Sequence, residues 1–281
     1  MNFDGPLQPF YYTPGVLRSL KPADLSRFIP SAPLPPEVTK PRKRGRKGGV
    51  KNRLRKTRNR TPLPIVITGN ARSLNNKLEE LSACTKHYSE YKLASCIAVS
   101  ETWFKDSSTG IDIDNYKCIR GDRTDAACKD GGGGVCLYVN NRYCHPNNVY
   151  KTGHVCTPNV EILTVTLRPY YLPREFPKVT VNVVYVPCSA HDETAAEIIA
   201  ETVNQQQTST PDGVVLLTGD FNTCRIEAHL PQFEQCVTGP TREGNTLDKF
   251  LCNILINLLR FLILEGVITL CHIYYLFIKQ N

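Results

Sequence analysis

The 281-residue sequence lacks several features that define common classes of protein. None of its 12 cysteines stands in a C-x-x-C pair, which argues against a zinc ribbon or finger. The N-terminal stretch MNFDGPLQPFYYTPG has neither a basic segment nor an apolar core, so it does not resemble a secretory signal peptide. Disulfide scaffolds are short, cysteine-dense and secreted. We therefore expect reduced cysteines, most of them buried as small apolar groups.

Acidic residues are missing from one segment of the chain. Of the 34 Lys and Arg residues, 12 lie within residues 40–60, which contain no Asp or Glu. The rest of the chain contains 22 basic and 26 acidic residues. The net charge of +8 therefore combines a basic segment with a mildly acidic body. With 41% apolar and 21% charged residues, the chain is not wholly disordered, collagen-like or coiled-coil.

Two segments precede the folded body. Residues 1–39 contain eight prolines and predict a disordered or extended tail, and residues 40–60 predict a flexible arm, because dense like charges repel. The arm is expected to contact nucleic-acid phosphates without sequence preference; the alternatives are a nuclear-import signal and a solvated tail without a partner. The predicted nucleic-acid-binding residues are Arg42, Lys43, Arg44, Arg46, Lys47, Lys51, Arg53, Arg55 and Lys56.

The predicted folded domain spans residues 61–250. Pro64–Gly69 and Ser95–Ser100 are short apolar runs typical of buried strands. Between them, Leu74, Leu78 and Leu81 recur at helical spacing, and Ser73 is placed to cap that helix. This strand–helix–strand opening favours an α/β fold.

The middle of the chain predicts antiparallel pairing. Glu161–Leu167 and Val179–Val186 are rich in β-branched residues and are separated by a proline-containing loop. Thr194–Gln207 predicts an amphipathic helix, and Val214–Leu217 predicts another buried strand. The order β-α-β, β-β-β, α-β indicates a layered α/β sandwich rather than a barrel.

A run of four glycines, Gly131–Gly134, leads into a predicted strand at Val135–Val139. A phosphate-binding P-loop would also need a following Lys-Ser/Thr and a helix, and neither is present. The run is therefore interpreted as a turn that precedes a strand.

Polar residues follow the predicted strands. Asn70, Glu101 and Asp220 end three of them, Tyr185 lies near the end of a fourth, and Asn222 comes two residues after Asp220. Two carboxylates with amides and a phenol could hold one hard cation and an anionic substrate, as Mg²⁺-assisted phosphoester chemistry requires. The alternative is that polar residues simply end these strands.

Five motifs carry a resemblance to a known family. N-x-x-S-L, S-E-T-W, V-Y-x-P, G-D-F-N and T-R-x-x-x-T-L-D occur in this order and resemble the endonuclease/exonuclease/phosphatase superfamily. More narrowly, they resemble the apurinic-type endonuclease domain of LINE-type (non-LTR) retrotransposons, as do PREFPKVTVNVVYVP and KDGGGGVCLYVN. The similarity covers residues 44–253. It implies a layered α/β sandwich and DNA as the substrate to be nicked, in the nucleus or cytoplasm.

The resemblance also implies residue roles. Glu101 would ligate Mg²⁺, or Mn²⁺ in its place, and Asn70 would support the same metal site. Tyr185 and Asn222 would contact the scissile phosphate, and Asp220 would orient or activate the attacking water.

One family feature is missing. Asp248 matches an aspartate that orients a histidine in the family, whose motif S-D-H this chain lacks, together with any D-H pair. His272 lies among apolar residues and is expected to be packed; His87 is expected near the first helix, and the other four histidines in loops. Loss of a general base costs on the order of 10²–10⁴ in rate, so we expect an impaired enzyme. The alternative is a catalytically dead remnant that binds nucleic acid.

The tail at residues 251–281 departs from the family and is strongly apolar. Residues 261–278 are about long enough to span a membrane, but Glu265 lies inside, so a tail-anchored protein is not favoured. A second interpretation is that residues 267–278 replace a lost last core strand. The favoured interpretation is an arbitrary extension that packs poorly and leaves the sandwich without that strand.

Overall fold

The computed structural model describes residues 64–105, 107–128, 131–237, 239–241 and 245–254, and the backbone of residues 274–275. All of them belong to the compact unit formed by residues 49–281. The proline-rich tail, the basic arm and most of the C-terminal tail lie outside the described residues.

The first sheet has five strands in the order β11-β1-β2-β4-β3. β1 and β2 run parallel, as a strand–helix–strand unit requires, and β4 runs antiparallel to both β2 and β3. Strands are predicted correctly at β1, β2 and β4, whereas β3 was not predicted. The strands are Val66–Asn70 (β1), Cys96–Ser100 (β2), Tyr116–Gly121 (β3), Val135–Asn140 (β4) and Tyr274–Tyr275 (β11).

The second sheet has six strands in the order β5-β6-β7-β8-β10-β9. β5, β6 and β7 form an antiparallel meander, which confirms the predicted pairing of β6 with β7. The chain then crosses over through a helix, and β8 lies parallel to β7. The strands are Val149–Cys156 (β5), Glu161–Leu167 (β6), Val179–Tyr185 (β7), Val214–Asp220 (β8), Glu234–Gln235 (β9) and Asp248–Cys252 (β10).

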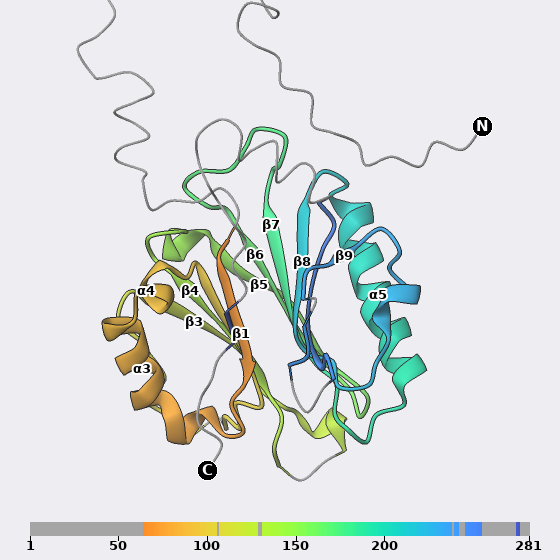
Figure 1. The fold of residues 1–281 in the computed structure, drawn as a ribbon, viewed down its shortest axis with the longest axis horizontal. Coiled ribbons are helices and arrows are strands. Elements are labelled where there is room, and N and C mark those ends of the chain that lie inside the picture. The colour runs from red at the N-terminus through yellow and green to blue at the C-terminus, as the bar shows by residue number, and fades with distance from the viewer. Residues whose placement is uncertain are drawn as a thin grey trace, which may run out of the picture. The chain divides into compact units, whose positions relative to one another are not determined.

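The two sheets pack face to face, and helices cover their outer faces (Figure 1). Because side chains alternate along a strand, Val66 and Leu216 point into the layer between the sheets, whereas Ile67 and Val215 point toward the helices. This arrangement confirms the predicted layered α/β sandwich.

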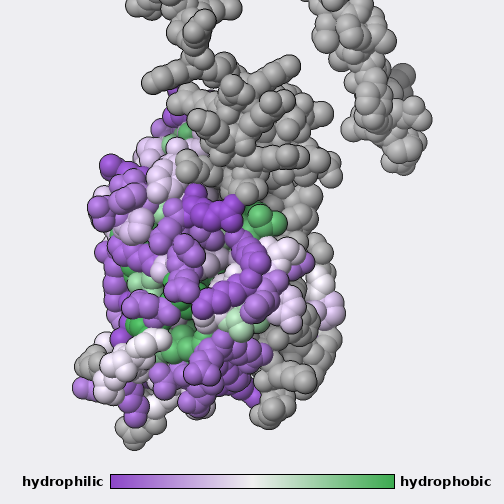
Figure 2. Space-filling view, turned by 90° about the vertical axis from the view of Figure 1, so that its left-hand side faces the viewer, coloured by the Kyte–Doolittle hydropathy of each residue, from purple (hydrophilic) through white to green (hydrophobic). Residues whose placement is uncertain are grey.

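Each outer face is covered by amphipathic helices. Helices α3 (Leu78–His87) and α4 (Ser89–Leu93) cover the first sheet, and α5 (Asp192–Ser209) covers the second. Figure 2 shows that the face carrying α3 and α4 is mostly hydrophilic, as expected for helices that bury one side. Short 3-10 helices occupy Leu74–Lys77 (η3), Asp125–Ala127 (η4), Pro146–Asn148 (η5) and Ile226–Ala228 (η6).

Two local predictions are wrong. Ser73 makes no capping hydrogen bond, and its φ of 76° is left-handed, because its backbone N–H donates to the carbonyl of Glu101 at 2.9 Å. The chain therefore enters α3 through η3 instead of a capped first turn. His154 lies on β5 rather than in a loop, in a strand that contains an irregularity between Lys151 and Gly153.

The cysteine prediction is only partly correct: of the 11 described cysteines, five are buried, four are partly buried, and Cys128 and Cys188 are exposed. The thiols of Cys96, Cys136, Cys144 and Cys224 are free and buried. They pack as small apolar side chains in all three core clusters.

Of the C-terminal tail, residues 251–254 and the backbone of residues 274–275 are described. Tyr274–Tyr275 form β11, which pairs in parallel with Ile67 and Thr68 of β1. This pairing favours the interpretation in which the tail supplies an edge strand. Among the described residues, no helix is long and apolar enough to cross a membrane.

Candidate active site

Five strands deliver the predicted site residues to one edge of the sandwich. Asn70 is the last residue of β1, and Glu101 directly follows the parallel strand β2. Tyr185 and Asp220 are the last residues of the parallel strands β7 and β8 and are paired in register. Asp248 opens the antiparallel strand β10 directly opposite Asp220. The structure thus brings these residues together from both sheets.

Asn70 joins the two sheets at the centre of the site. Its Nδ2 donates to Glu101 Oε1 at 2.6 Å and to Asp220 Oδ2 at 2.8 Å. Its Oδ1 accepts from the backbone N–H of Arg72 at 3.0 Å. One neutral amide therefore holds two carboxylates close to each other, a concentration of negative charge that favours a cation.

Asn222 is fixed beside Asp220. Asp220 Oδ1 accepts from the Asn222 backbone N–H at 3.1 Å, and Asn222 Nδ2 donates to the carbonyl of Val186 at 2.6 Å. Gly219 precedes Asp220 with a φ of 138°, and a Cβ there would lie 2.0 Å from the carbonyl oxygen of Val184. Only glycine lets β8 approach β7 this closely just before the site.

Tyr185 is a protonated donor at this edge. Burial raises its pKa, and the negative charges of Glu101 and Asp220 raise it further, whereas the charge of Arg123 acts in the opposite direction. The phenol therefore keeps its proton at neutral pH and can donate it in a hydrogen bond to an anion.

Strained backbone is concentrated around the site. Seven non-glycine residues have a positive φ among those described, and five of them follow β1, β2 or β8. Such conformations cost about 1–3 kcal/mol each and tend to cluster where geometry serves function. The five residues are Arg72, Ser73, Glu101, Trp103 and Asn222.

The layer beneath the site changes from apolar to polar. Thr68, Ser100 and Thr218 are almost completely buried on the faces that carry Asn70 and Asp220. Their hydroxyl groups find no hydrogen-bond partner within the described part of the chain. The packed core between the sheets therefore ends in hydroxyls just below the carboxylates.

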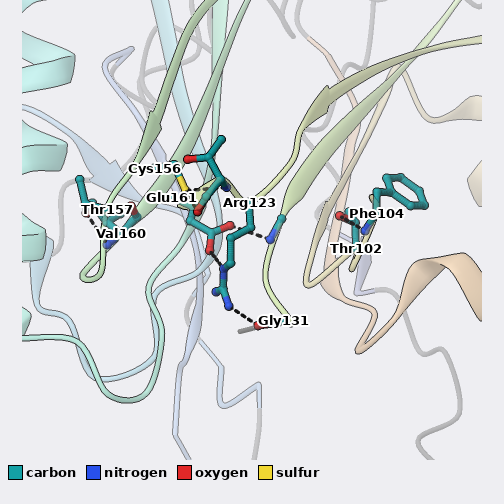
Figure 3. Close-up of polar contacts among 10 residues, drawn as sticks. Thr102, Phe104, Arg123, Gly131, Cys156, Thr157, Val160 and Glu161 are labelled. Carbon is teal, nitrogen blue, oxygen red and sulfur yellow. Dashed lines mark hydrogen bonds and ion pairs between the residues drawn. The ribbon is translucent and has the colours of Figure 1, made fainter. Parts of the chain in front are cut away.

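A buried ion pair beside the site was not predicted from the sequence. Arg123 Nε contacts Glu161 Oε1 at 2.6 Å, and Arg123 Nη1 donates to the carbonyl of Gly131 at 2.6 Å, as Figure 3 shows. Glu161 Oε2 accepts from the backbone N–H of Gly134 at 2.6 Å, and Glu161 pairs in register with Tyr185. The only signal in the sequence was a carboxylate at the start of an otherwise apolar strand.

The donor set fits a hard divalent cation. Glu101 and Asp220 offer carboxylate oxygens, ligands that suit Mg²⁺ or Mn²⁺, and the Asn70 amide holds both carboxylates in place. In the described residues, no group of three or more His, Cys, Asp or Glu side chains is arranged to hold a metal. A Mg²⁺ ion that also binds substrate phosphate usually has only one or two carboxylate ligands from the protein.

The described histidines serve other parts of the fold. The rings of His145 and His191 cap the N-termini of η5 and α5, and His229 pairs with Glu193 at 3.2 Å. His87 ends α3, as expected. His272 and the predicted nucleic-acid-binding residues of the arm lie outside the described residues.

A scan against protein-family models finds no match, and a search of curated proteins finds no relative. Solved structures are similar at low sequence identity. The catalytic domain of human Nocturnin with bound sulfate is 15% identical over 69% of this chain and 83% of that chain, with a TM-score of 0.49. The AP endonuclease of Leishmania major is 15% identical over 66% and 78%, with a TM-score of 0.48. A 3'-5' exonuclease of Neisseria meningitidis is 14% identical over 66% and 86%, with a TM-score of 0.44.

Proposed function

We propose that the chain hydrolyses phosphodiester bonds in DNA with a divalent metal ion, as a nicking endonuclease of the LINE retrotransposon type. The observation that carries the proposal is the bridge from Asn70 to Glu101 and Asp220. It places two carboxylates from opposite sheets at one edge of the sandwich. Polar residues that merely end a strand would not need to be brought together in this way. The family motifs in the sequence support the same assignment.

Glu101 would ligate the metal ion, and Asn70 would support the same metal site. The left-handed backbone of Glu101, with a φ of 53°, directs the chain out of β2 at this point, and the Asn70 amide orients its carboxylate. When bound, Mg²⁺ neutralises charge on the phosphate and on the leaving oxygen. The strain at Glu101 is consistent with a ligand that is held in place before the substrate arrives.

The remaining residues act on the phosphate and on water. Tyr185 and Asn222 would donate hydrogen bonds to phosphate oxygens, where charge develops in the transition state. Asp220 would accept a proton from the attacking water, because its carboxyl group is held in place by Asn70 and Asn222.

Asp248 lies opposite Asp220 without the histidine that follows in the family. We therefore propose a slow enzyme, in which Asp220 acts on water without assistance from a histidine. The competing function is nucleic-acid binding through residues 40–60 without catalysis. The missing histidine after Asp248 favours this function too.

Nicking of supercoiled plasmid by the full chain in Mg²⁺ tests the assignment. Glu101→Ala should reduce the rate on the order of 100-fold, because it removes a metal ligand. Glu79→Ala is the matched control, since Glu79 is an exposed glutamate on α3 outside the site, and its rate should equal that of the unmodified chain. Equal rates for Glu101→Ala and the unmodified chain would contradict the proposal.

A further inference from the structure

A groove of about 490 Å³ is formed by loops that also carry the candidate site. Trp103 follows Glu101 by two residues, Ser73 follows Asn70 by three, and Arg123 is close enough for its charge to act on Tyr185. The groove therefore lies beside the loops that carry the site, although none of the proposed catalytic or metal-binding residues lines it. Its lining includes Ser73, Asn75, Trp103, Lys105, Arg123 and Gly131.

Trp103 presents an aromatic surface in this groove. Its side chain is 43% exposed, although the neighbouring Thr102 and Phe104 are buried. Its left-handed backbone, with a φ of 57°, is held by a hydrogen bond from its N–H to the carbonyl of Gly133 at 2.9 Å. An exposed indole on a fixed backbone can receive a planar ring at little cost in conformational entropy.

Arg123 and the glycine run form another part of the wall of the groove. The guanidinium lies so close to the glycine run that a Cβ on Gly133 would come within 2.1 Å of Arg123 Nη2. Because Arg123 is paired with Glu161, its part is to position this wall (Figure 3). Lys105 is the exposed cation of the groove and can meet a phosphate, while Asp125 is the one acidic residue in the lining.

We propose that this groove binds one nucleotide of the DNA strand next to the scissile phosphodiester, with its base stacked on Trp103 and its phosphate near Lys105. The proposal rests on the proposed function and adds a base-stacking subsite to it. Stacking on an aromatic side chain accepts any base, and a lysine recognises phosphate without reading sequence. The groove would therefore hold an unpaired base with little sequence preference.

The test uses Trp103 itself, which is the only tryptophan in the chain. The full chain in EDTA is titrated with a dye-labelled oligothymidylate and, separately, with an oligomer of equal length made of abasic deoxyribose phosphates. Dye anisotropy reports binding of either strand, including binding through the basic arm. Tryptophan emission reports only the groove, and we expect quenching by oligothymidylate and none by the abasic strand.

Variants test the two contacts separately by anisotropy. Trp103→Ala should weaken binding of oligothymidylate about tenfold, and Trp103→Phe should weaken it less, because a phenyl ring still stacks. Tyr171→Ala is the aromatic control, since Tyr171 is 50% exposed in the loop between β6 and β7, at the far end of those strands from Tyr185. Lys105→Gln should weaken binding of both strands, whereas Lys92→Gln on α4 should not.

The subsite would be overturned if oligothymidylate bound without quenching Trp103 emission. It would also be overturned if oligothymidylate and the abasic strand quenched that emission equally. Absence of binding by anisotropy would overturn it as well. The proposed function can fail independently of the subsite. Quenching without Mg²⁺-dependent nicking would support the subsite and contradict the nuclease assignment. Nicking without quenching would support the nuclease assignment and contradict the subsite.

Discussion

At the scale of single residues, the proposed function assigns different roles to the two aspartates of the site. Asp220 is held by Asn70 and Asn222, whereas the sequence gives Asp248 no following histidine. The two aspartates face each other across β8 and β10, and the proposed function gives only Asp220 a part in the reaction.

This difference predicts unequal effects of two matched substitutions on plasmid nicking. Asp220→Asn should reduce the rate on the order of 100-fold or more, because the proposed proton acceptor is lost. Asp248→Asn should change it by less than about threefold, because its family role is already absent. Comparable losses in the two variants would show that Asp248 still takes part in the reaction.

His154 predicts a pH dependence of stability. Burial lowers its pKa from the ordinary value of 6.5, with a further contribution from the charge of Lys151. Between 6.5 and its lower folded value, the unfolded chain binds more protons than the folded one, so the free energy of unfolding falls as pH falls through that window. His154→Gln should make the free energy of unfolding less dependent on pH between about 7.5 and 5.5 than it is in the unmodified chain. Urea denaturation at several pH values measures this, and identical slopes in both proteins would refute it.

At the scale of elements, the loops after β1, β2 and β3 and the glycine run before β4 form one connected structure. Thr102 and Trp103 donate to the carbonyls of Gly134 and Gly133, and Gly134 in turn donates to Glu161. A substitution that shifts the glycine run should therefore also shift Glu101, which immediately precedes Thr102.

Two glycines with nearly equal backbone angles make this testable. Gly133 has a φ of 65° and lies against Arg123, whereas Gly110 has a φ of 69° and nothing within 4 Å of a Cβ built there. Gly110→Ala should cost about 1 kcal/mol of unfolding free energy from conformation alone. Gly133→Ala should cost about 1–3 kcal/mol more, because it must displace a buried guanidinium, and it should also slow nicking. Equal losses of stability from chemical denaturation would contradict this packing.

The sequence predicted those elements whose local pattern is strong. Apolar runs at β1, β2, β7 and β8 lead to the polar residues Asn70, Glu101, Tyr185 and Asp220, so the strands and the polar residues at their ends could be predicted. The strands β3 and β5 were missed because Lys117, Arg120 and Lys151 interrupt their apolar pattern. The contact of Arg123 with Glu161 could not be predicted, since 38 residues separate them and only the strand order brings them together.

At the scale of the whole molecule, charge divides the chain into a basic arm and a mildly acidic remainder. The arm is proposed to bind phosphates, and the folded domain to cleave. Deleting residues 40–60 should weaken binding to duplex DNA on the order of tenfold or more at about 0.1 M salt. It should also reduce the slope of log affinity against log salt by roughly 0.9 for each phosphate contact removed. Anisotropy titrations over a salt series measure both the affinity and the slope. An unchanged slope would show that the arm does not contact the phosphates of DNA.

The most direct measurement is the dependence of nicking on the divalent ion. The full chain is incubated with supercoiled plasmid in Mg²⁺, in EDTA, and after Mg²⁺ is restored in excess over EDTA. Slow nicking in Mg²⁺, none in EDTA and full recovery are predicted, because the Asn70, Glu101 and Asp220 cluster would act only with its cation. Nicking that persists in EDTA, or a folded and soluble protein that never nicks, would contradict the assignment of this site as a metal-dependent phosphodiesterase.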